Sequence, residues 1–303
     1  MPADWTLPRI VAIKRRSGRA VATVPPHAYF VVSAVFHYLG PSFAVLLFAR
    51  VQVLGVAWLR IVSAALIFAA WRRPWRSLGS LDRDGRRLLL AWGIVLAAMN
   101  SCFYVAISKL PLGTVAAIEF LPVIALAALG ARSPRNVLAL TAAVAGVYLL
   151  TNIRVAGALA GFLFAFANAG LFALYIVLAD KVAKRPQLSG IDGLAAAMLI
   201  GALVITPIGG REVVPALGHP VALLAGVGVG VSSSVIPYVT DQLAMARLPR
   251  ATYATMVALL PALATITGII VLAQIPTWTE TAGVAAVIAG VGLHRPPIKH
   301  AHN

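Results

Sequence analysis

Long apolar runs separated by short polar breaks fill most of this sequence. A helix that crosses a bilayer needs about 20 mostly apolar residues. Ten runs approach or reach that length, and they predict spanning helices at residues 28–48, 53–71, 88–108, 111–129, 137–152, 158–179, 190–208, 220–240, 251–273 and 279–293. The breaks hold only a few residues, so neighbouring helices should form antiparallel hairpins, and no loop has room for a soluble domain.

Lysine and arginine are unevenly divided between alternate breaks. One set of breaks receives most of them, including Arg72, Arg73, Arg76, Arg83, Arg86, Arg87, Arg132, Arg135, Lys181, Lys184 and Arg185. The other set receives only Arg50, Lys109, Arg154 and Arg211. Cytoplasmic loops are enriched in Lys and Arg, so both termini are expected in the cytoplasm, as short tails at residues 1–27 and 294–303.

Ten runs divide into five and five, with repeats expected at residues 28–153 and 157–293. An odd number of helices in each half makes the second half enter the membrane from the opposite side, as in many secondary transporters. Lys109-Leu110-Pro111 opens the fourth run, and Arg247-Leu248-Pro249 opens the ninth run from the opposite side. The expected fold class is an all-α integral membrane protein with ten transmembrane helices as two inverted five-helix repeats.

Composition supports lipid as the solvent of this chain. Of its 303 residues 60% are hydrophobic and 11% are charged, whereas soluble domains carry about 25% charged residues. The net charge of +16 would fit nucleic-acid binding, but the basic residues sit between apolar runs, where membrane proteins keep them. Nucleic acid is therefore excluded as a partner. The single cysteine, Cys102, excludes an intrachain disulfide and a cysteine metal site.

Two charged residues lie inside predicted spans. Arg60 is seven residues into the second run and Glu119 is eight residues into the fourth. Both runs go from outside to inside, so at about 1.5 Å per residue both side chains lie roughly 10–12 Å below the outer surface. An Arg60–Glu119 ion pair lining a central cavity fits these depths. The alternative is that Arg60 reaches toward the interface or binds backbone carbonyls.

Glu119 has three interpretations that the sequence leaves open. It carries a proton during transport, it binds the ammonium group of a substrate, or it is a structural partner of Arg60. Intramembrane carboxylates are rare and usually face a partner or a watery cavity, and each of the three interpretations meets that requirement. Proton/substrate pathway residues are therefore expected to be Glu119, Arg60 and His37.

Further polar residues lie near the middle of several runs. His37 precedes Gly40-Pro41, a pair expected to kink its helix and free carbonyls for a cavity. Pro237 predicts a second helix break. Candidate cavity-lining residues are Tyr38, Asn100, Tyr104, Asn168, Tyr175, Ser233 and Tyr238. Asp180, Asp192 and Asp241 come at helix ends and are interpreted as interfacial.

The sequence holds no catalytic constellation. It lacks a pair of acids inside the spans, a histidine cluster and a Gly-rich phosphate loop, so no enzyme activity, metal or cofactor is expected. A membrane-embedded enzyme would need catalytic loops, and the breaks are too short for them. A non-transporting membrane subunit is the other alternative. The expected partners are the lipid bilayer, a small-molecule substrate and protons, and a homodimer is left open.

Several stretches together resemble the EamA members of the drug/metabolite transporter superfamily, near the threonine/homoserine exporter branch. They are Val56-Ala57-Trp58-Leu59-Arg60, Leu110-Pro111-Leu112-Gly113, Ala117-Ile118-Glu119-Phe120, Pro237-Tyr238, Arg247-Leu248-Pro249 and Leu260-Pro261-Ala262. The resemblance covers all ten runs. It implies a multi-pass exporter in the inner membrane, which moves amino acids or related metabolites by alternating access with proton coupling.

The chain departs from the family pattern at three positions. Val45 stands where the resemblance leads us to expect lysine, and Leu260 and Gln274 stand where it leads us to expect glutamate. The second half has therefore lost acids that relatives keep, and Glu119 is expected to be the only acid in the middle of the membrane. The resemblance accordingly does not carry over a threonine or homoserine substrate.

Overall fold

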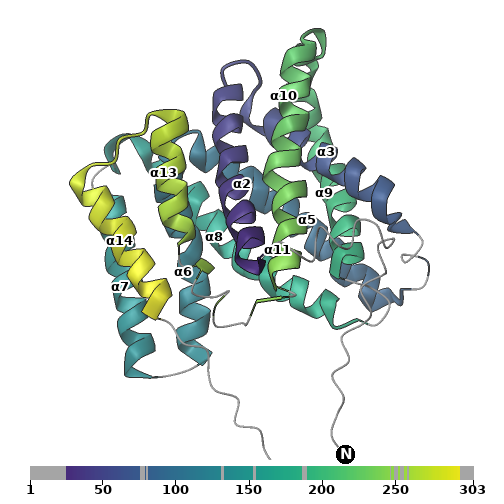
Figure 1. Cartoon of the computed structure of the whole chain (residues 1–303). Coiled ribbons are helices and arrows are strands. Elements are labelled where there is room, and N and C mark those ends of the chain that lie inside the picture. The colour runs from purple at the N-terminus through teal and green to yellow at the C-terminus, as the bar shows by residue number, and fades with distance from the viewer. Residues whose placement is uncertain are drawn as a thin grey trace, which may run out of the picture.

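A computed structural model describes residues 25–75, 79, 81–130, 133–152, 155–185, 190–245, 247–248, 252, 256–257 and 259–293. Every regular element in this described part is a helix, so the predicted all-α class is confirmed there (Figure 1). The predicted tails at residues 1–27 and 294–303 lie outside the described residues, apart from residues 25–27, and so does Pro249 of the second repeat motif.

The helices follow the order of the predicted runs. The first half contains α2 (Pro26–Leu47), α3 (Val53–Arg72), α5 (Arg83–Ile107), α6 (Leu112–Gly130) and α7 (Pro134–Asn152). The second half contains α8 (Val155–Ala183), α9 (Gly190–Val213), α10 (Pro220–Gly230), α11 (Ile236–Met245), α13 (Leu260–Leu272) and α14 (Trp278–Leu293). A 3₁₀ turn at Val214–Gly218 precedes α10, and a π-helical turn at Val231–Val235 joins α10 to α11.

Lipid-facing side chains account for the apolar composition. Within the described residues, six helical segments are long and apolar enough to cross a membrane, and four further apolar helices are shorter. Large side chains such as Leu203, Leu224 and Ile270 are more than 70% exposed. A surface that exposes leucine and isoleucine to this extent matches lipid rather than water.

The two predicted proline irregularities have different outcomes. α2 runs unbroken through Pro41, and the Ser42 hydroxyl donates a hydrogen bond to the Tyr38 carbonyl at 2.9 Å. The helix therefore accommodates this proline without ending. The second irregularity lies at the π-helical turn just before Pro237. A proline cannot donate to the carbonyl four residues earlier, so Pro237 frees the carbonyl of Ser233 inside that turn.

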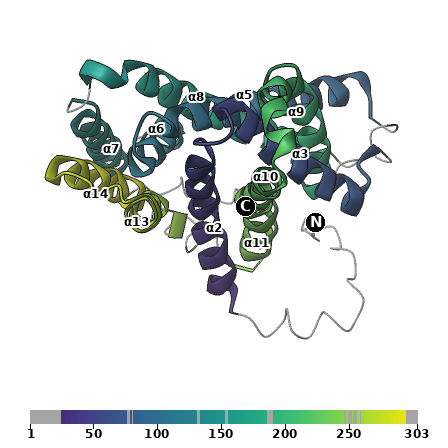
Figure 2. The ribbon, with the colours of Figure 1, turned by 90° about the horizontal axis from the view of Figure 1, so that it is seen from above.

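Helices from opposite halves of the chain pack against each other. α3 lies along α9, α7 along α14 and α5 along α8, and Figure 2 shows the first two pairs on opposite sides of the molecule. Small residues permit this close approach. A Cβ atom added at Gly146 of α7 would overlap the backbone of Gly283 in α14, and one added at Gly209 of α9 would overlap Leu54 and Trp58 of α3.

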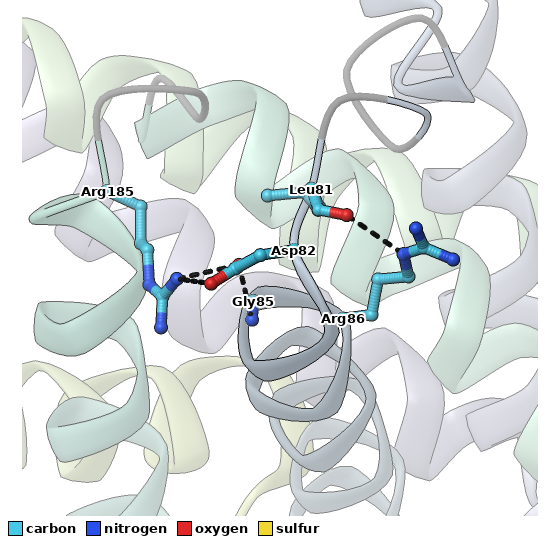
Figure 3. A network of polar contacts seen from close by, with 5 residues as sticks. All are labelled: Leu81, Asp82, Gly85, Arg86 and Arg185. Carbon is cyan, nitrogen blue, oxygen red and sulfur yellow. Dashed lines mark hydrogen bonds and ion pairs between the residues drawn. The ribbon is translucent and has the colours of Figure 1, made fainter.

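Two ion pairs join the halves at the end of the molecule where α5 begins. Arg185, which follows α8, donates to both carboxylate oxygens of Asp82 at 2.8 and 2.9 Å. Asp82 also caps α5 by accepting from the Gly85 backbone nitrogen at 2.9 Å, as Figure 3 shows. This cap explains why α5 begins at Arg83, earlier than predicted. Arg72 of α3 pairs with Asp192 of α9 at 2.7 Å.

The Asp82 contacts predict a pH-dependent stability. The Gly85 N–H and then Arg185 lower the pKa of Asp82 below its usual value of 3.8. A lowered pKa contributes stability above the unfolded-state value, and this contribution is lost as the pH falls through the folded-state value. Asp82→Asn keeps a capping side chain but removes the charge, so its unfolding temperature in detergent should be lower than wild type near pH 6.

The difference between wild type and Asp82→Asn should disappear as the pH is lowered below 3.8, the ordinary pKa of the carboxyl group. Asp84→Asn is the matched control because Asp84 lies in the same helical turn. A temperature difference that stays constant with pH would contradict the assignment of this contribution to the Asp82 charge.

Candidate functional site

A central cavity of about 260 Å³ lies among helices from both halves of the chain. We call it the inner cavity. Its lining residues come from α2, α3, α5, α6, α8, α11 and α13 and include polar, aromatic and aliphatic side chains. They are Phe30, Ser33, Ala34, His37, Pro41, Arg60, Met99, Asn100, Phe103, Glu119, Phe120, Asn168, Phe172, Ile176, Tyr238, Asp241, Val257 and Leu260.

Helical periodicity explains the long axis of the inner cavity. α8 contributes Asn168, Phe172 and Ile176, four residues apart on one helical face. α2 contributes a matching stripe that begins at Phe30 and ends at Pro41. The cavity therefore follows these helices from the end where α2 begins to the middle of the molecule, where Arg60 and Glu119 lie.

Glu119 is placed on the inner cavity by α6. Its side chain is 8% exposed, and its Oε1 accepts a hydrogen bond from Asn168 Nδ2 at 3.1 Å. Asn168 is completely buried, and its Oδ1 has no hydrogen-bond partner within the described residues. A buried carboxylate needs hydrogen bonds or an opposite charge. The amide meets part of this need and leaves an acceptor oxygen beside the carboxylate.

Arg60 is anchored by the second half of the chain. Its Nε donates to Ser234 Oγ at 3.1 Å, and its Nη2 donates to the Ser233 carbonyl at 3.2 Å. That carbonyl is the one freed by Pro237. The guanidinium also lies 5.4 Å from the centre of the Tyr104 ring, within the range of a cation–π interaction. These contacts hold a 7% exposed cation at the cavity wall.

Arg60 and Glu119 line one cavity without a direct bond. The ion pairs recorded in the described part of the chain do not join them. Arg60 is held by the π-helical turn and Glu119 by Asn168. Opposite charges that line one buried cavity still attract each other, so all three interpretations of this carboxylate stay open.

The other predicted site residues fall into two groups. His37, Asn100, Asn168 and Tyr238 line the inner cavity. Tyr38, Tyr104, Tyr175 and Ser233 do not line it. Tyr104 lies under Arg60, Ser233 supplies a carbonyl to the same arginine, and Tyr175 stacks on Phe172 with ring centres 6.4 Å apart. Each of these three residues therefore contacts a residue that lines the cavity.

Asp241 lies near the end of α11, as predicted, and the prediction did not include its place on the inner cavity. It lines the inner cavity from α11, and Ser33 Oγ lies 3.4 Å from its Oδ1. Ser33 also donates to the Pro237 carbonyl at 3.1 Å. Glu119 is therefore not the only acid on this cavity. The three-residue spacing from Tyr238, which puts both on one helical face, is the signal that would have identified Asp241.

The inner cavity can bind an amphoteric solute but offers no obvious reaction chemistry. A guanidinium, two carboxylates and an imidazole surround a space whose remaining wall includes Phe103, Phe120 and Phe172. Opposite charges suit a zwitterion, and the phenyl rings suit an apolar side chain. Within the described ranges, no group of three or more His, Cys, Asp or Glu side chains could hold a metal ion.

Comparisons with known proteins concern both sequence and fold. The EamA-like transporter family model matches residues 159–294. Threonine/homoserine exporter RhtA of Salmonella typhimurium (strain SL1344) is 32% identical over 253 residues, which are 82% of this chain and 84% of that protein. The exporter of the same name from Escherichia coli (strain K12) matches to the same extent. A solved crystal structure is similar with a TM-score of 0.53 at 17% identity, over 88% of this chain and 96% of the other, which concerns the fold alone.

Proposed function

Because this chain belongs to the EamA-like transporter family, we propose that it is an inner-membrane secondary transporter that exports small amino acids or related metabolites by alternating access. Members of this family are transporters and not enzymes, and the chain is accordingly a multi-pass membrane protein. The observation that carries the proposal is the inner cavity. Arg60 and Glu119, which have opposite charges and separate hydrogen-bond partners, both line it.

The helix pairings support two inverted five-helix repeats. The helices of the two halves can be matched in chain order if α10 and α11 count as one helix. In this match α3 packs on its counterpart α9, α6 on α13 and α7 on α14. Two further sets of pairings are reciprocal. α5 packs on α8 as α11 packs on α2, and α6 packs on α8 as α13 packs on α2. A pseudo-two-fold axis in the membrane plane generates all of these relations.

The distribution of charge supports an orientation with both termini in the cytoplasm. Arg72 and Arg185 lie at the end where α5 begins, in the breaks that carry most of the basic residues. The inner cavity reaches the same end through Phe30, Asp241 and Val257. The described conformation therefore faces the cytoplasm, and a substrate would enter the inner cavity from there.

Glu119 is proposed to carry the proton that drives export. Its position at the deep end of the inner cavity gives it access to the cytoplasm in this conformation. A rearrangement that opens the opposite end would give it access to the outside. Arg60 would then bind the carboxylate of an amino acid. The ammonium group of that amino acid would lie in the same cavity as the carboxylates of Asp241 and Glu119. The phenyl rings around it favour amino acids with apolar surface.

The test is amino-acid efflux from cells that overproduce the protein and cells that lack it. Cells preloaded with radiolabelled threonine, homoserine, leucine or phenylalanine should release at least one of them several-fold faster when the protein is present. In proteoliposomes an inward proton gradient should accelerate this flux. If none of a full panel of amino acids and their toxic analogues moved faster, the exporter assignment would fail for this substrate class.

A further inference from the structure

A second cavity, of about 410 Å³, lies at the opposite end of the molecule. We call it the outer cavity. Its lining residues come from α2, from the end of α5, from α6 with the segment before it, and from α13 and α14 with the segment between them. It shares no lining residue with the inner cavity. The mechanism proposed above does not use this space.

The two cavities are stacked along the same helices. α6 contributes Thr114 to the outer cavity and Glu119 to the inner one, and α13 contributes Thr265 and Leu260 in the same way. Between them on α6, residues 115–118 are completely buried. Gly113 packs so closely on Thr265 that an added Cβ atom would overlap it. The buried stretch of α6 separates the two sets of lining residues, so a solute that crosses it from the inner cavity arrives in the outer cavity.

The outer cavity carries groups of both charges. Lys109 is exposed, lines the cavity, and has no ion pair among those recorded in the described chain. Glu280 lines it as a carboxylate that is 4% exposed. Thr277 fixes that carboxylate through its backbone nitrogen at 2.8 Å and its hydroxyl at 3.0 Å.

Neutral hydrogen-bonding groups line the same cavity as these charges. The Gln274 Oε1 accepts from the Leu112 backbone nitrogen at 3.0 Å, which fixes the amide at the first turn of α6. Thr114 is 4% exposed and lines the same space. A cavity lined by a fixed amide, a hydroxyl, an ammonium and a carboxylate suits a small solute that carries both charges.

We propose that the outer cavity is a second binding site for a zwitterionic amino acid, reached from the outer face, with Lys109 binding the carboxylate and Glu280 attracting the ammonium group. The proposal rests on the proposed export of amino acids. It adds a site that remains accessible from outside while the inner cavity faces the cytoplasm. External amino acid would therefore bind the chain in the described conformation.

Equilibrium binding of radiolabelled L-threonine to the purified full-length protein in detergent tests this site. Wild type should bind two molecules per chain. Lys109→Gln should bind one with unchanged affinity and lose affinity for the other by about tenfold or more, because a charge-assisted hydrogen bond is removed. Lys109→Arg should restore the second site. Arg50→Gln, which removes another cation at the same end but outside the cavity, should leave both sites intact.

One bound threonine per wild-type chain, or two unchanged sites in Lys109→Gln, would overturn the proposal. Thr114→Val is the second variant if Lys109→Gln does not fold, and it should weaken the same site. The cell efflux assay separates this proposal from the proposed function. Threonine efflux that persists while Lys109→Gln binds normally removes the outer site only, whereas absence of efflux for every amino acid removes the exporter assignment.

Discussion

Glu119→Gln should slow proton-driven export by about ten- to a hundredfold while the protein stays folded. The glutamine amide has nearly the same shape as the carboxylate, and its oxygen can still accept the hydrogen bond from Asn168 Nδ2. It cannot bind and release a proton, however, so the coupling step is lost. Burying a neutral amide also costs less than burying a charge, so the unfolding temperature should not fall.

Two flux measurements separate the proton-carrier and ammonium-site roles of Glu119. Net efflux from proteoliposomes under a proton gradient should be lost in Glu119→Gln, whereas exchange of internal for external amino acid should continue. Loss of both fluxes would identify Glu119 as the ammonium site instead of the proton carrier. Asp84→Asn removes an exposed carboxylate that does not line the inner cavity and should leave both rates unchanged. Wild-type efflux with an unchanged pH profile in Glu119→Gln would exclude any role in coupling.

Gly40→Ala should destabilise the protein by about 1–3 kcal/mol, as expected for an extra methyl group in a tightly packed core. A Cβ atom added at Gly40 would lie 2.6 Å from the backbone nitrogen of Ser233 and 2.8 Å from its Cα. These are backbone atoms of the π-helical turn and cannot rotate away as a side chain would. Because Ser233 also accepts a hydrogen bond from Arg60, the displaced turn should lower the transport rate as well.

Gly228→Ala is the matched control for Gly40→Ala. It makes the same chemical change in α10, where no atom lies within 4 Å of the added Cβ, so its stability should be unchanged or slightly greater. Thermal unfolding in detergent and the initial efflux rate are the two measurements. If both variants unfold at the wild-type temperature, the close contact of α2 with the π-helical turn does not contribute to the stability of the protein.

Hydropathy located the helices well because membrane-length apolar runs are a strong local signal. The all-helical class and the order of the elements were predictable in this way. The start of α5 was missed because Asp82 and Gly85 look like ordinary loop residues until their hydrogen bond is seen. The pairing of α3 with α9 was not predicted, because contact between distant helices depends on three-dimensional packing that single-run hydropathy does not encode.

The site was predictable where a charge stood alone in an apolar run. Arg60 and Glu119 were found for this reason, and both line the inner cavity. Backbone carbonyls were one predicted alternative for Arg60, but neither the helix that supplies the carbonyl nor the Asn168 partner of Glu119 was predictable. Arg60 binds a carbonyl that Pro237 frees in another helix, and Asp241 near the end of its run looked interfacial. Tyr38 and Tyr104 were identified as polar residues, but the helix rotation that places them behind the lining cannot be read from sequence.

The three departures from the family pattern all line one of the two cavities. Val45 and Gln274 line the outer cavity, and Leu260 lines the inner cavity. Each replaces an expected charged residue by a neutral one. These three positions thus lie on surfaces that a solute would touch if the proposed sites are correct, and a change of substrate would be expected to alter such surfaces.

The pairing of α3 with α9 has a consequence for the biogenesis of the chain. α3 is the second helix to leave the ribosome in the described order, and α5, α6, α7 and α8 are all synthesised before its main partner. The main partner of α7 is α14, the last helix in the described part of the chain. The face of α3 that packs on α9 therefore stays in lipid until α9 is made, and the face of α7 that packs on α14 stays there until translation is nearly complete. A chain truncated before Trp278 would leave α7 uncovered and so become a target for proteolytic quality control in the membrane.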